Sequence, residues 1–191
     1  MRLIFATQNQ HKFEEIKSRL TSNIDLVNLS ELHFLNEIPE TGSTLRENAL
    51  EKASFIHHLF HENTMADDTG LEVDVLNGQP GIYSARYAGF KKNSEDNMEK
   101  LLTEMKGRTN RKAKFRTVIA LIINGQRKLF EGIAEGNILT QRAGEGGFGY
   151  DPIFQPIGSS KTFAEMSLTE KNQRSHRSKA FNKVIEYLNS L

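Results

Sequence analysis

The 191-residue chain has no cysteine, only four prolines, a formal net charge of +1 and no long hydrophobic run. The lack of cysteine excludes a disulfide framework, a thiol nucleophile and a thiolate metal site. The small net charge argues against a long nucleic-acid backbone as partner, although a local basic cluster can still bind a small phosphate ligand. The first apolar run ends at Thr7, too early for a signal peptide, and no window reaches the length of a membrane span. We therefore expect a cytoplasmic protein.

Hydrophobic residues make up 37% of the chain and charged residues 26%, which is typical of a globular domain. The length fits one domain over residues 1–191. Hydrophobic periodicity predicts helices interleaved with strands, and Asn124-Gly125 is a hairpin signal that requires antiparallel pairing. We therefore predict an α/β fold with a mixed sheet flanked by helices. The predicted strands are 2–6, 64–68, 71–76, 115–123 and 128–134, and the predicted helices are 11–20, 44–60 (with Thr44 and Glu47 as a capping box) and two capped by Ser94 and Ser175.

A polar turn between the first predicted strand and helix is the first candidate site. Its residues are Thr7, Gln8, Asn9, Gln10, His11 and Lys12. The free N–H groups at a helix start attract phosphate, and the lysine adds a positive charge. The alternative is an ordinary capped turn with a solvated lysine.

Four acidic residues form the second candidate site. Glu40 precedes a turn, Glu47 lies in the first turn of the helix 44–60, and Asp67 and Asp68 end a strand. Hard oxygen ligands suit Mg²⁺, and a carboxylate beside the metal can accept a proton from an attacking water. Adjacent strand residues face opposite ways, so both aspartates reach one cleft only if the strand breaks, which Gly70 would permit. The alternative is a helix cap and two solvated turn residues.

Asn48 and Lys52 lie one turn apart on the same predicted helix and therefore share a face. On that face, Lys52 can balance the acidic residues or reach a phosphate. The alternative is an ordinary surface pair.

A glycine-rich loop, 144–152, is the third candidate site. Its glycines let the backbone approach a ligand closely, Phe148 and Tyr150 offer faces for a flat base, and Asp151 can accept hydrogen bonds from base or sugar. The alternative is a flexible loop whose aromatic rings fill the core.

The segment 171–177 is the fourth candidate site. Ser175 can cap the last helix, which then begins with His176 and Arg177. Cations at a helix start oppose the helix dipole, so this helix start is a candidate site for an electron-rich group such as a purine 6-oxo group or a phosphate. The alternative is a solvated basic face.

These segments, in this order, resemble the inosine triphosphate pyrophosphatase family, whose members hydrolyse non-canonical purine nucleotides. The strings that carry the resemblance are Ala6-Thr7-x-Asn9-x-x-Lys12, Glu40-Thr41-Gly42-x-Thr44-x-x-Glu47-Asn48-Ala49-x-x-Lys52-Ala53, Ala66-Asp67-Asp68-Thr69-Gly70-Leu71, the run from Pro80 to Gly89, the run from Gly146 to Phe154, and Ser175-His176-Arg177. The resemblance covers nearly the whole chain. The resemblance implies an elongated mixed sheet flanked by helices, two lobes with a central cleft, and a homodimer.

The resemblance also implies roles for individual residues. Thr7 to Lys12 would hold the triphosphate. Glu40 and Asp68 would bind Mg²⁺, and Asp68 would accept the proton of the attacking water. Glu47 and Lys52 would line the same cleft, and Arg86 would lie near it. The nucleotide contacts would come from Thr69, Phe148, Gly149, Tyr150, Asp151, Lys171, His176 and Arg177.

Two residues depart from the family pattern. Thr69 stands where the family commonly has serine, which keeps the hydroxyl, and Ser178 stands where it commonly has glycine. Ser178 falls inside the predicted last helix, where serine is tolerated.

The expected reaction is attack of water on the α-phosphorus of ITP, dITP or XTP, which releases a nucleoside monophosphate and pyrophosphate. Donors from Lys171, His176 or Arg177 would favour a 6-oxo purine over adenine, because an unpaired buried polar group costs free energy. Two alternatives stay open. One is a pyrophosphatase like the septum-formation inhibitors, whose Ser-rich N-terminal string with paired arginines is not matched by Ala6 to Lys12. The other is a nucleotide sensor, which has no need of a water-activating carboxylate.

Overall fold

A computed structural model describes residues 1–20 and 24–190 of the chain. The chain divides into two compact units. Unit 1 consists of Met1–Asp68, Thr117–Glu131 and Ala180–Leu191, and unit 2 consists of Thr69–Arg116 and Gly132–Lys179.

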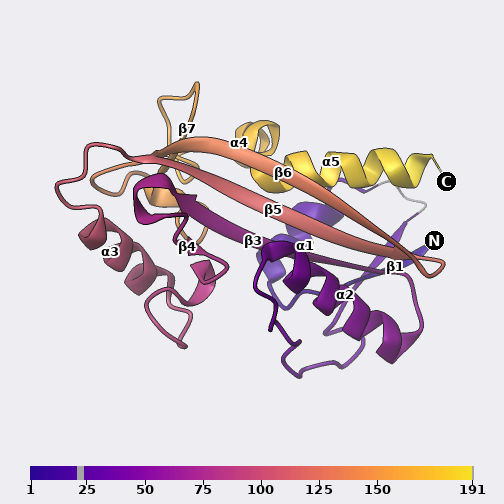
Figure 1. Ribbon diagram of the computed structural model, residues 1–191. Helices are drawn as coiled ribbons and strands as arrows, with labels where there is room; N and C mark the ends of the chain where they lie inside the picture. Colours follow the sequence, from indigo (N-terminus) through magenta and orange to yellow (C-terminus); the bar gives the residue numbers. More distant parts are fainter. Residues whose placement is uncertain (21–23, 191) are drawn as a thin grey trace. The chain divides into compact units, whose positions relative to one another are not determined.

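The strands of the described residues form a mixed sheet, as the sequence predicts. The strand order is β2-β1-β3-β5-β6-β7, with β4 paired to β3 (Figure 1). β1 is parallel to β2 and β3, whereas β3 with β4 and β6 with β7 are antiparallel. The strands are β1 (Arg2–Phe5), β2 (Asp25–Asn28), β3 (Thr64–Val73), β4 (Pro80–Gly81), β5 (Lys112–Ile123), β6 (Gln126–Ile138) and β7 (Phe154–Pro156).

Five α-helices accompany the sheet in the described part of the chain. They are α1 (Gln10–Lys17), α2 (Leu45–Phe60), α3 (Ser94–Glu104), α4 (Leu168–Arg174) and α5 (His176–Asn189). Three short 3-10 helices, η1 (Asp74–Leu76), η2 (Ser84–Arg86) and η3 (Asp151–Ile153), lie in unit 2. The mixed α/β class predicted from the sequence is therefore confirmed.

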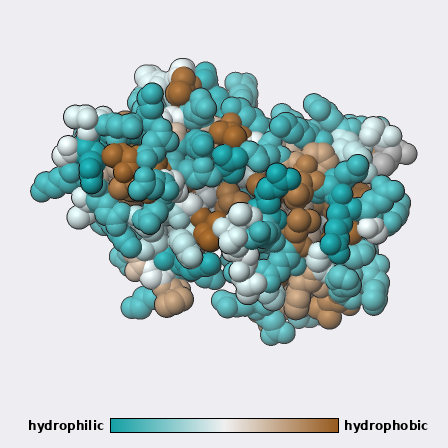
Figure 2. Space-filling view, viewed as in Figure 1, coloured by the Kyte–Doolittle hydropathy of each residue, from teal (hydrophilic) through white to brown (hydrophobic). Residues whose placement is uncertain are grey.

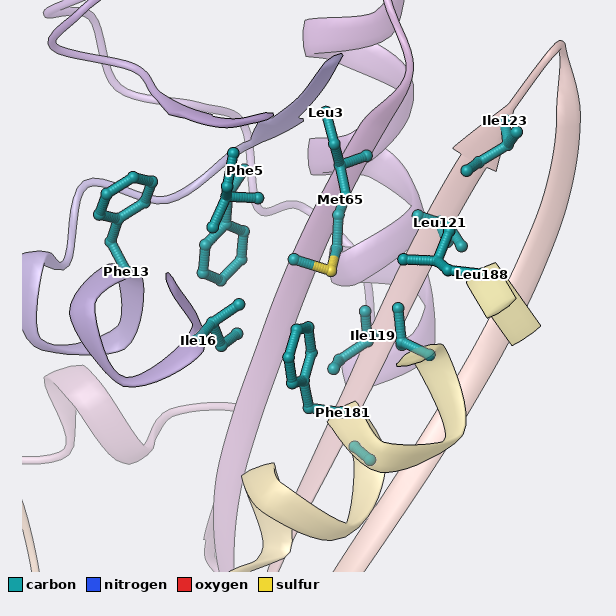
Figure 3. Packing of buried hydrophobic residues seen from close by; sticks show 13 residues of the cluster. Leu3, Phe5, Phe13, Ile16, Met65, Ile119, Leu121, Ile123, Phe181 and Leu188 are labelled. Atoms are coloured by element: carbon teal, nitrogen blue, oxygen red, sulfur yellow. The ribbon is translucent and has the colours of Figure 1, made fainter. Parts of the chain in front are cut away.

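The core of unit 1 joins β1, β3 and β5 to helices α1 and α5. Figure 3 shows Phe181 of α5 pointing toward Met65 and Ile119, and Phe13 and Ile16 of α1 packing beside Phe5. These side chains are almost fully buried. The apolar faces predicted for the first and last helices are the faces that the core uses.

The core of unit 2 is built around three phenylalanines. The ring centroid of Phe115 on β5 lies 4.7 Å from that of Phe154 on β7, and the Phe154 and Phe163 centroids lie 5.2 Å apart. Helix α3 adds Met98 and Leu101, both buried.

The sequence predicts separate strands at 64–68 and 71–76, and this separation is wrong. β3 runs without interruption from Thr64 to Val73, so Asp67, Asp68 and Gly70 belong to one strand. A Cβ at position 70 would lie 2.6 Å from the carbonyl oxygen of Gly81. Glycine is therefore required because β4 approaches β3 closely there, and it leaves the strand regular. The predicted strand 71–76 is also too long, because Asp74–Leu76 is a 3-10 helix.

Two helix starts also differ from the prediction. The cap of α3 is Asn93, whose side chain accepts hydrogen bonds from the N–H groups of Glu95 and Asp96, and Ser94 is the first helical residue. Asparagine and serine are both strong N-cap residues, so the local sequence does not distinguish Asn93 from Ser94 as the cap. Helix α4 was not predicted, although Ser167 and Glu170 form a complete capping box at its start.

The predicted hairpin is confirmed. Asn124 and Gly125 have φ values of 50° and 77° between β5 and β6, as a two-residue turn of this type requires. No helix in the described residues is long and apolar enough to cross a membrane. The face shown in Figure 2 is largely hydrophilic, with hydrophobic side chains in scattered patches.

Candidate active site

Asp67 and Asp68 point to different partners within unit 1. Asp67 is buried, and its Oδ2 accepts a hydrogen bond of 2.7 Å from the Nζ atom of Lys12 on α1. Asp68 faces α2, where its Oδ2 accepts a hydrogen bond of 3.1 Å from Nδ2 of Asn48. This split follows from the alternation of side chains along an unbroken strand. The acidic pair therefore serves two neighbouring positions.

Lys52 joins two of the predicted acids. Its Nζ atom lies 2.6 Å from Oε1 of Glu40 and 3.4 Å from Oδ1 of Asp68. Glu40 comes from the segment before α2 and Asp68 from β3, so two distant parts of the chain converge on one ammonium group. The side chain of Lys52 is 9% exposed, whereas Glu40 is 32% exposed and Asp68 14%. The two carboxylates therefore keep more contact with solvent than the lysine does.

Burial and charge shift the titration of this cluster. Burial raises the pKa of Asp68, and the positive charges of Lys52 and Lys12 offset only part of that effect. Burial alone would lower the pKa of Lys52, but the charges of Asp68, Glu40 and Asp67 together outweigh it and raise its pKa. A carboxylate with a raised pKa holds a proton more readily, which suits a general base.

The acidic cluster has the donor chemistry for Mg²⁺ but only a partial ligand set. Among the described residues, no group of three or more His, Asp or Glu side chains is placed to hold a metal ion. Glu40 and Asp68 nevertheless converge on a common point with hard oxygen atoms. Mg²⁺ is commonly held by one or two carboxylates, with waters and substrate phosphates as the other ligands. The residues present fit a magnesium ion of that kind.

The polar turn before α1 is ordered by its own side chains. Asn9 caps the helix, since its Oδ1 accepts the N–H of Lys12 at 3.2 Å, and Thr7 Oγ1 accepts the N–H of Asn9 at 3.2 Å. The exposed Gln8 donates to the carbonyl of Asn36, and the exposed Gln10 donates to Glu14. His11 is also exposed. The turn is thus a capped helix start, and it presents Lys12 beside the acidic cluster through the ion pair with Asp67.

Glu47 does not join the acidic cluster. Its Oε2 accepts hydrogen bonds of 2.7 Å from both the N–H and the hydroxyl of Ser43, and these bonds lower the pKa of Glu47. Thr44 caps α2 as predicted, accepting the N–H of Glu47 at 3.1 Å. Glu47 therefore fixes the loop before α2 through Ser43, and its expected place in the cleft stays a prediction.

The second cluster lies in unit 2 and is centred on Phe148. Lys171 Nζ lies 5.0 Å from the centre of the Phe148 ring, and the guanidinium carbon of Arg177 lies 5.3 Å from it. Asp151 Oδ2 accepts 2.6 Å and 2.8 Å hydrogen bonds from Lys171 Nζ and the N–H of Phe148. Gly147 has φ +74°, and a Cβ there would lie 2.2 Å from Asp151 Oδ2. The loop therefore needs glycine at this position.

Two predicted base contacts belong to the core of unit 2. Tyr150 is 5% exposed and its hydroxyl donates to the carbonyl of Ser84 at 2.8 Å, so its ring is not a free stacking surface. Burial raises the pKa of this hydroxyl. His176 is 3% exposed and stacks on Phe115, with ring centroids 4.6 Å apart. For Tyr150, the aromatic ring fills the core, which is the alternative the sequence left open.

The remaining predicted residues have separate places. Thr69 directly follows Asp68 in β3, and Gly149 adopts φ +63° in the loop before η3. Arg86 ends η2, and its guanidinium carbon lies 5.4 Å from the ring centre of Tyr83. Ser178 lies in α5, and its backbone N–H donates to Oγ of Ser175 at 3.1 Å, so Ser175 caps this helix as predicted.

The hydrogen bond between Asn48 and Asp68 was not predicted from the sequence. The available signal was the helical spacing of Asn48 and Lys52, which places both side chains on the face that meets Asp68. Helix α4, which carries Lys171, was signalled by the Ser167 to Glu170 spacing.

Comparison with known proteins places this geometry in a family. Residues 3–187 match the model of the Ham1 family. A dITP/XTP pyrophosphatase of Christiangramia forsetii is 53% identical over 98% of this chain and 99% of its own length. The corresponding protein of Caldanaerobacter subterraneus is 47% identical over 98% of this chain and 96% of its own length.

Solved structures agree with these relatives. The Ham1 protein of Staphylococcus aureus superposes with a TM-score of 0.92 at 40% identity, covering 100% of this chain and 99% of that one. A nucleoside-triphosphatase (dITP/XTP pyrophosphatase) of Mycobacterium abscessus gives a TM-score of 0.80 at 37% identity, covering 97% of this chain and 99% of that one. Because the family model and the relatives span almost the whole chain, this protein belongs to the Ham1 family.

Proposed function

We propose that this protein hydrolyses ITP, dITP and XTP to the nucleoside monophosphate and pyrophosphate. The observation that carries the proposal is the convergence of Glu40 and Asp68 on Lys52, next to the ion pair of Lys12 with Asp67. The relatives named dITP/XTP pyrophosphatase support this choice of substrates.

Within unit 1, the side chains of the cluster around Asp68 have separate tasks in the reaction. Asp68 accepts a proton from the attacking water, because its raised pKa and partial exposure suit a base that water can reach. Lys52 and Lys12 place positive charge beside the carboxylates, where they also offset the negative charge that develops on phosphate oxygens. Asn48 holds one oxygen of Asp68 and leaves the carboxylate in one orientation.

The proposal includes Mg²⁺, which Glu40 and Asp68 would hold. Once bound, the ion would neutralise charge on the phosphate oxygens of the nucleotide. The two carboxylates supply oxygen ligands with a solvent-facing side, and the ligand set is too small to hold the ion without water or phosphate.

Within unit 2, the Phe148 cluster would recognise the purine. The ring of Phe148 offers an aromatic face, and Lys171 and Arg177 place donors beside it. These donors would pair with a 6-oxo group and leave the 6-amino group of adenine unpaired, which costs free energy in a buried site. This arrangement supports a preference for ITP, dITP and XTP over ATP.

A homodimer and a cytoplasmic location also belong to the proposal. The homodimer follows the resemblance to the pyrophosphatase family, and the lack of cysteine supports a reducing compartment such as the cytoplasm. Sedimentation of the purified protein would test the first.

The decisive experiment is a turnover profile of the purified protein with ITP, dITP, XTP, GTP and ATP, each with Mg²⁺ and with excess EDTA. We expect pyrophosphate as product, a higher kcat/KM for ITP than for ATP, and loss of turnover in EDTA. Release of orthophosphate, or equal kcat/KM for ATP and ITP, would contradict the proposal. Tight binding of ITP without turnover would identify a nucleotide sensor instead.

A further inference from the structure

The segment that carries Glu40 is tied to α2 by carboxylates. Residues 37–42 have no regular secondary structure, so side-chain bonds contribute to the position of Glu40. The residue after it, Thr41, donates its backbone N–H to Glu51 Oε2 and its hydroxyl to Glu51 Oε1, both at 2.7 Å. One carboxylate thus binds one residue through both of its oxygens, and such charge-assisted, two-point bonds fix orientation as well as distance.

Helix α2 binds the segment 37–42 through two neighbouring pairs of residues. Glu51 and Lys52 are consecutive residues of α2, and they bind the consecutive residues Thr41 and Glu40. Lys52 holds the Glu40 carboxylate itself, at 2.6 Å, whereas Glu51 holds only the N–H and hydroxyl of Thr41. The bond from Lys52 therefore occupies a carboxylate oxygen of Glu40, whereas the bonds to Glu51 leave both of those oxygens available.

This difference matters once a divalent cation competes for the Glu40 oxygen atoms. A cation at Glu40 and Asp68 weakens the bond from Lys52, because both positive charges need the same oxygens. The bonds between Glu51 and Thr41 use no oxygen of Glu40 and do not compete. They can therefore keep Glu40 in place while its carboxylate exchanges an ammonium partner for a metal.

We propose that Glu51 is a positioning residue for Glu40, acting through Thr41 to hold the metal-binding carboxylate ready for Mg²⁺. This inference rests on the proposed function, since it assumes that Glu40 is a metal ligand. Side chains bonded directly to metal ligands commonly contribute roughly 10- to 100-fold to metal affinity, and Glu51, which acts one residue away, should contribute at the lower end of that range. We expect an effect of that size on Mg²⁺ affinity and little effect on kcat at saturating Mg²⁺.

The test is a calorimetric titration of Mg²⁺ into protein saturated with α,β-imido-ITP, a non-hydrolysable analogue. Glu51→Gln should raise the Mg²⁺ Kd about tenfold or more, because one acceptor oxygen becomes an NH₂ group. Thr41→Val, which lacks the hydroxyl, should also raise it, and Thr41→Ser should restore the wild-type value. The double variant Glu51→Gln with Thr41→Val should weaken Mg²⁺ binding by less than the two single effects combined, because the two residues act as one unit.

A matched control and a kinetic readout separate positioning from general damage. Glu31→Gln removes a carboxylate that accepts the N–H of Asn28 elsewhere in unit 1, and it should leave the Mg²⁺ Kd unchanged. In turnover assays with saturating ITP, Glu51→Gln should shift the Mg²⁺ concentration for half-maximal rate and keep kcat. A wild-type Mg²⁺ Kd in Glu51→Gln would overturn the positioning role. Absence of Mg²⁺ binding by the wild-type protein would instead overturn the metal in the proposed function.

Discussion

Replacing Lys171 with methionine tests the buried ion pair under the glycine-rich loop. The side chains of Lys171 and Asp151 are 8% and 5% exposed, and Nζ lies 2.6 Å from Oδ2. Methionine keeps most of the length and apolar contact but removes the charge. Asp151 then keeps the N–H of Phe148 as a donor at 2.8 Å and loses its ionic partner in a nearly dry site.

The expected cost is large because one charge stays buried without compensation. Breaking a buried pair by removing one partner costs about 3–5 kcal/mol. For a chain of this size, about 1 kcal/mol corresponds to roughly 2–4 °C in Tm, so Lys171→Met should lower Tm by roughly 6–20 °C. Adding Asp151→Asn removes the orphaned charge while its amide oxygen can still accept the N–H of Phe148. The double variant should therefore regain part of the lost stability.

Thermal unfolding followed by circular dichroism measures these differences. Lys161→Met is a matched control, because Lys161 forms a 2.8 Å ion pair with Glu170 whose side chains are 49% and 45% exposed. Exposed pairs contribute little, so this variant should lower the Tm by much less than Lys171→Met does. A Tm for Lys171→Met close to that of Lys161→Met would show that the buried pair does not stabilise the fold, as would a double variant less stable than Lys171→Met.

Three further predictions concern the proposed base, a helix cap and the core. Asp68→Asn should lower kcat for ITP by roughly 10²- to 10⁴-fold at saturating Mg²⁺, the range for loss of a general base, and full turnover would show that Asp68 has no such role. Hydrogen bonds from Lys161 and from Ser167 lower the pKa of Glu170 to about 2. Because the folded pKa is depressed, the stabilisation by Glu170 should be present above the ordinary glutamate pKa of about 4.3 and vanish as pH falls toward 2. The Tm difference between wild type and Glu170→Gln, measured from pH 7 to pH 2, should shrink over that window, and a difference independent of pH would contradict this. Phe181→Ala, at a position 0% exposed, should cost about 3–5 kcal/mol in urea unfolding, whereas a cost below about 1 kcal/mol would mean that the core shown in Figure 3 is not packed as described.

Local patterns in the sequence were sufficient for the fold class and for the longer helices and strands, whereas the short strands β2, β4 and β7 and helix α4 were not predicted. Helix α2 follows from its apolar periodicity and the Thr44 cap, and the β5–β6 hairpin follows from Asn124-Gly125, because each signal depends on residues close in the chain. Gly70 shows the limit of such patterns. Its requirement comes from the carbonyl of Gly81, a contact that local sequence does not reveal.

The candidate site shows the same division between sequence and tertiary structure. The residues along the chain specify which groups are available: hard oxygen ligands, two lysines, a glycine-rich loop and a basic helix start. The folded structure sets their partners, because β3 and α2 bring Asp68 to Asn48 and Lys52. It turned Glu47 toward Ser43, placed Tyr150 in the core of unit 2 and gave Glu51 its bonds to Thr41. Side-chain identity fixes what a residue can bind, whereas packing between segments distant in the chain fixes what it meets.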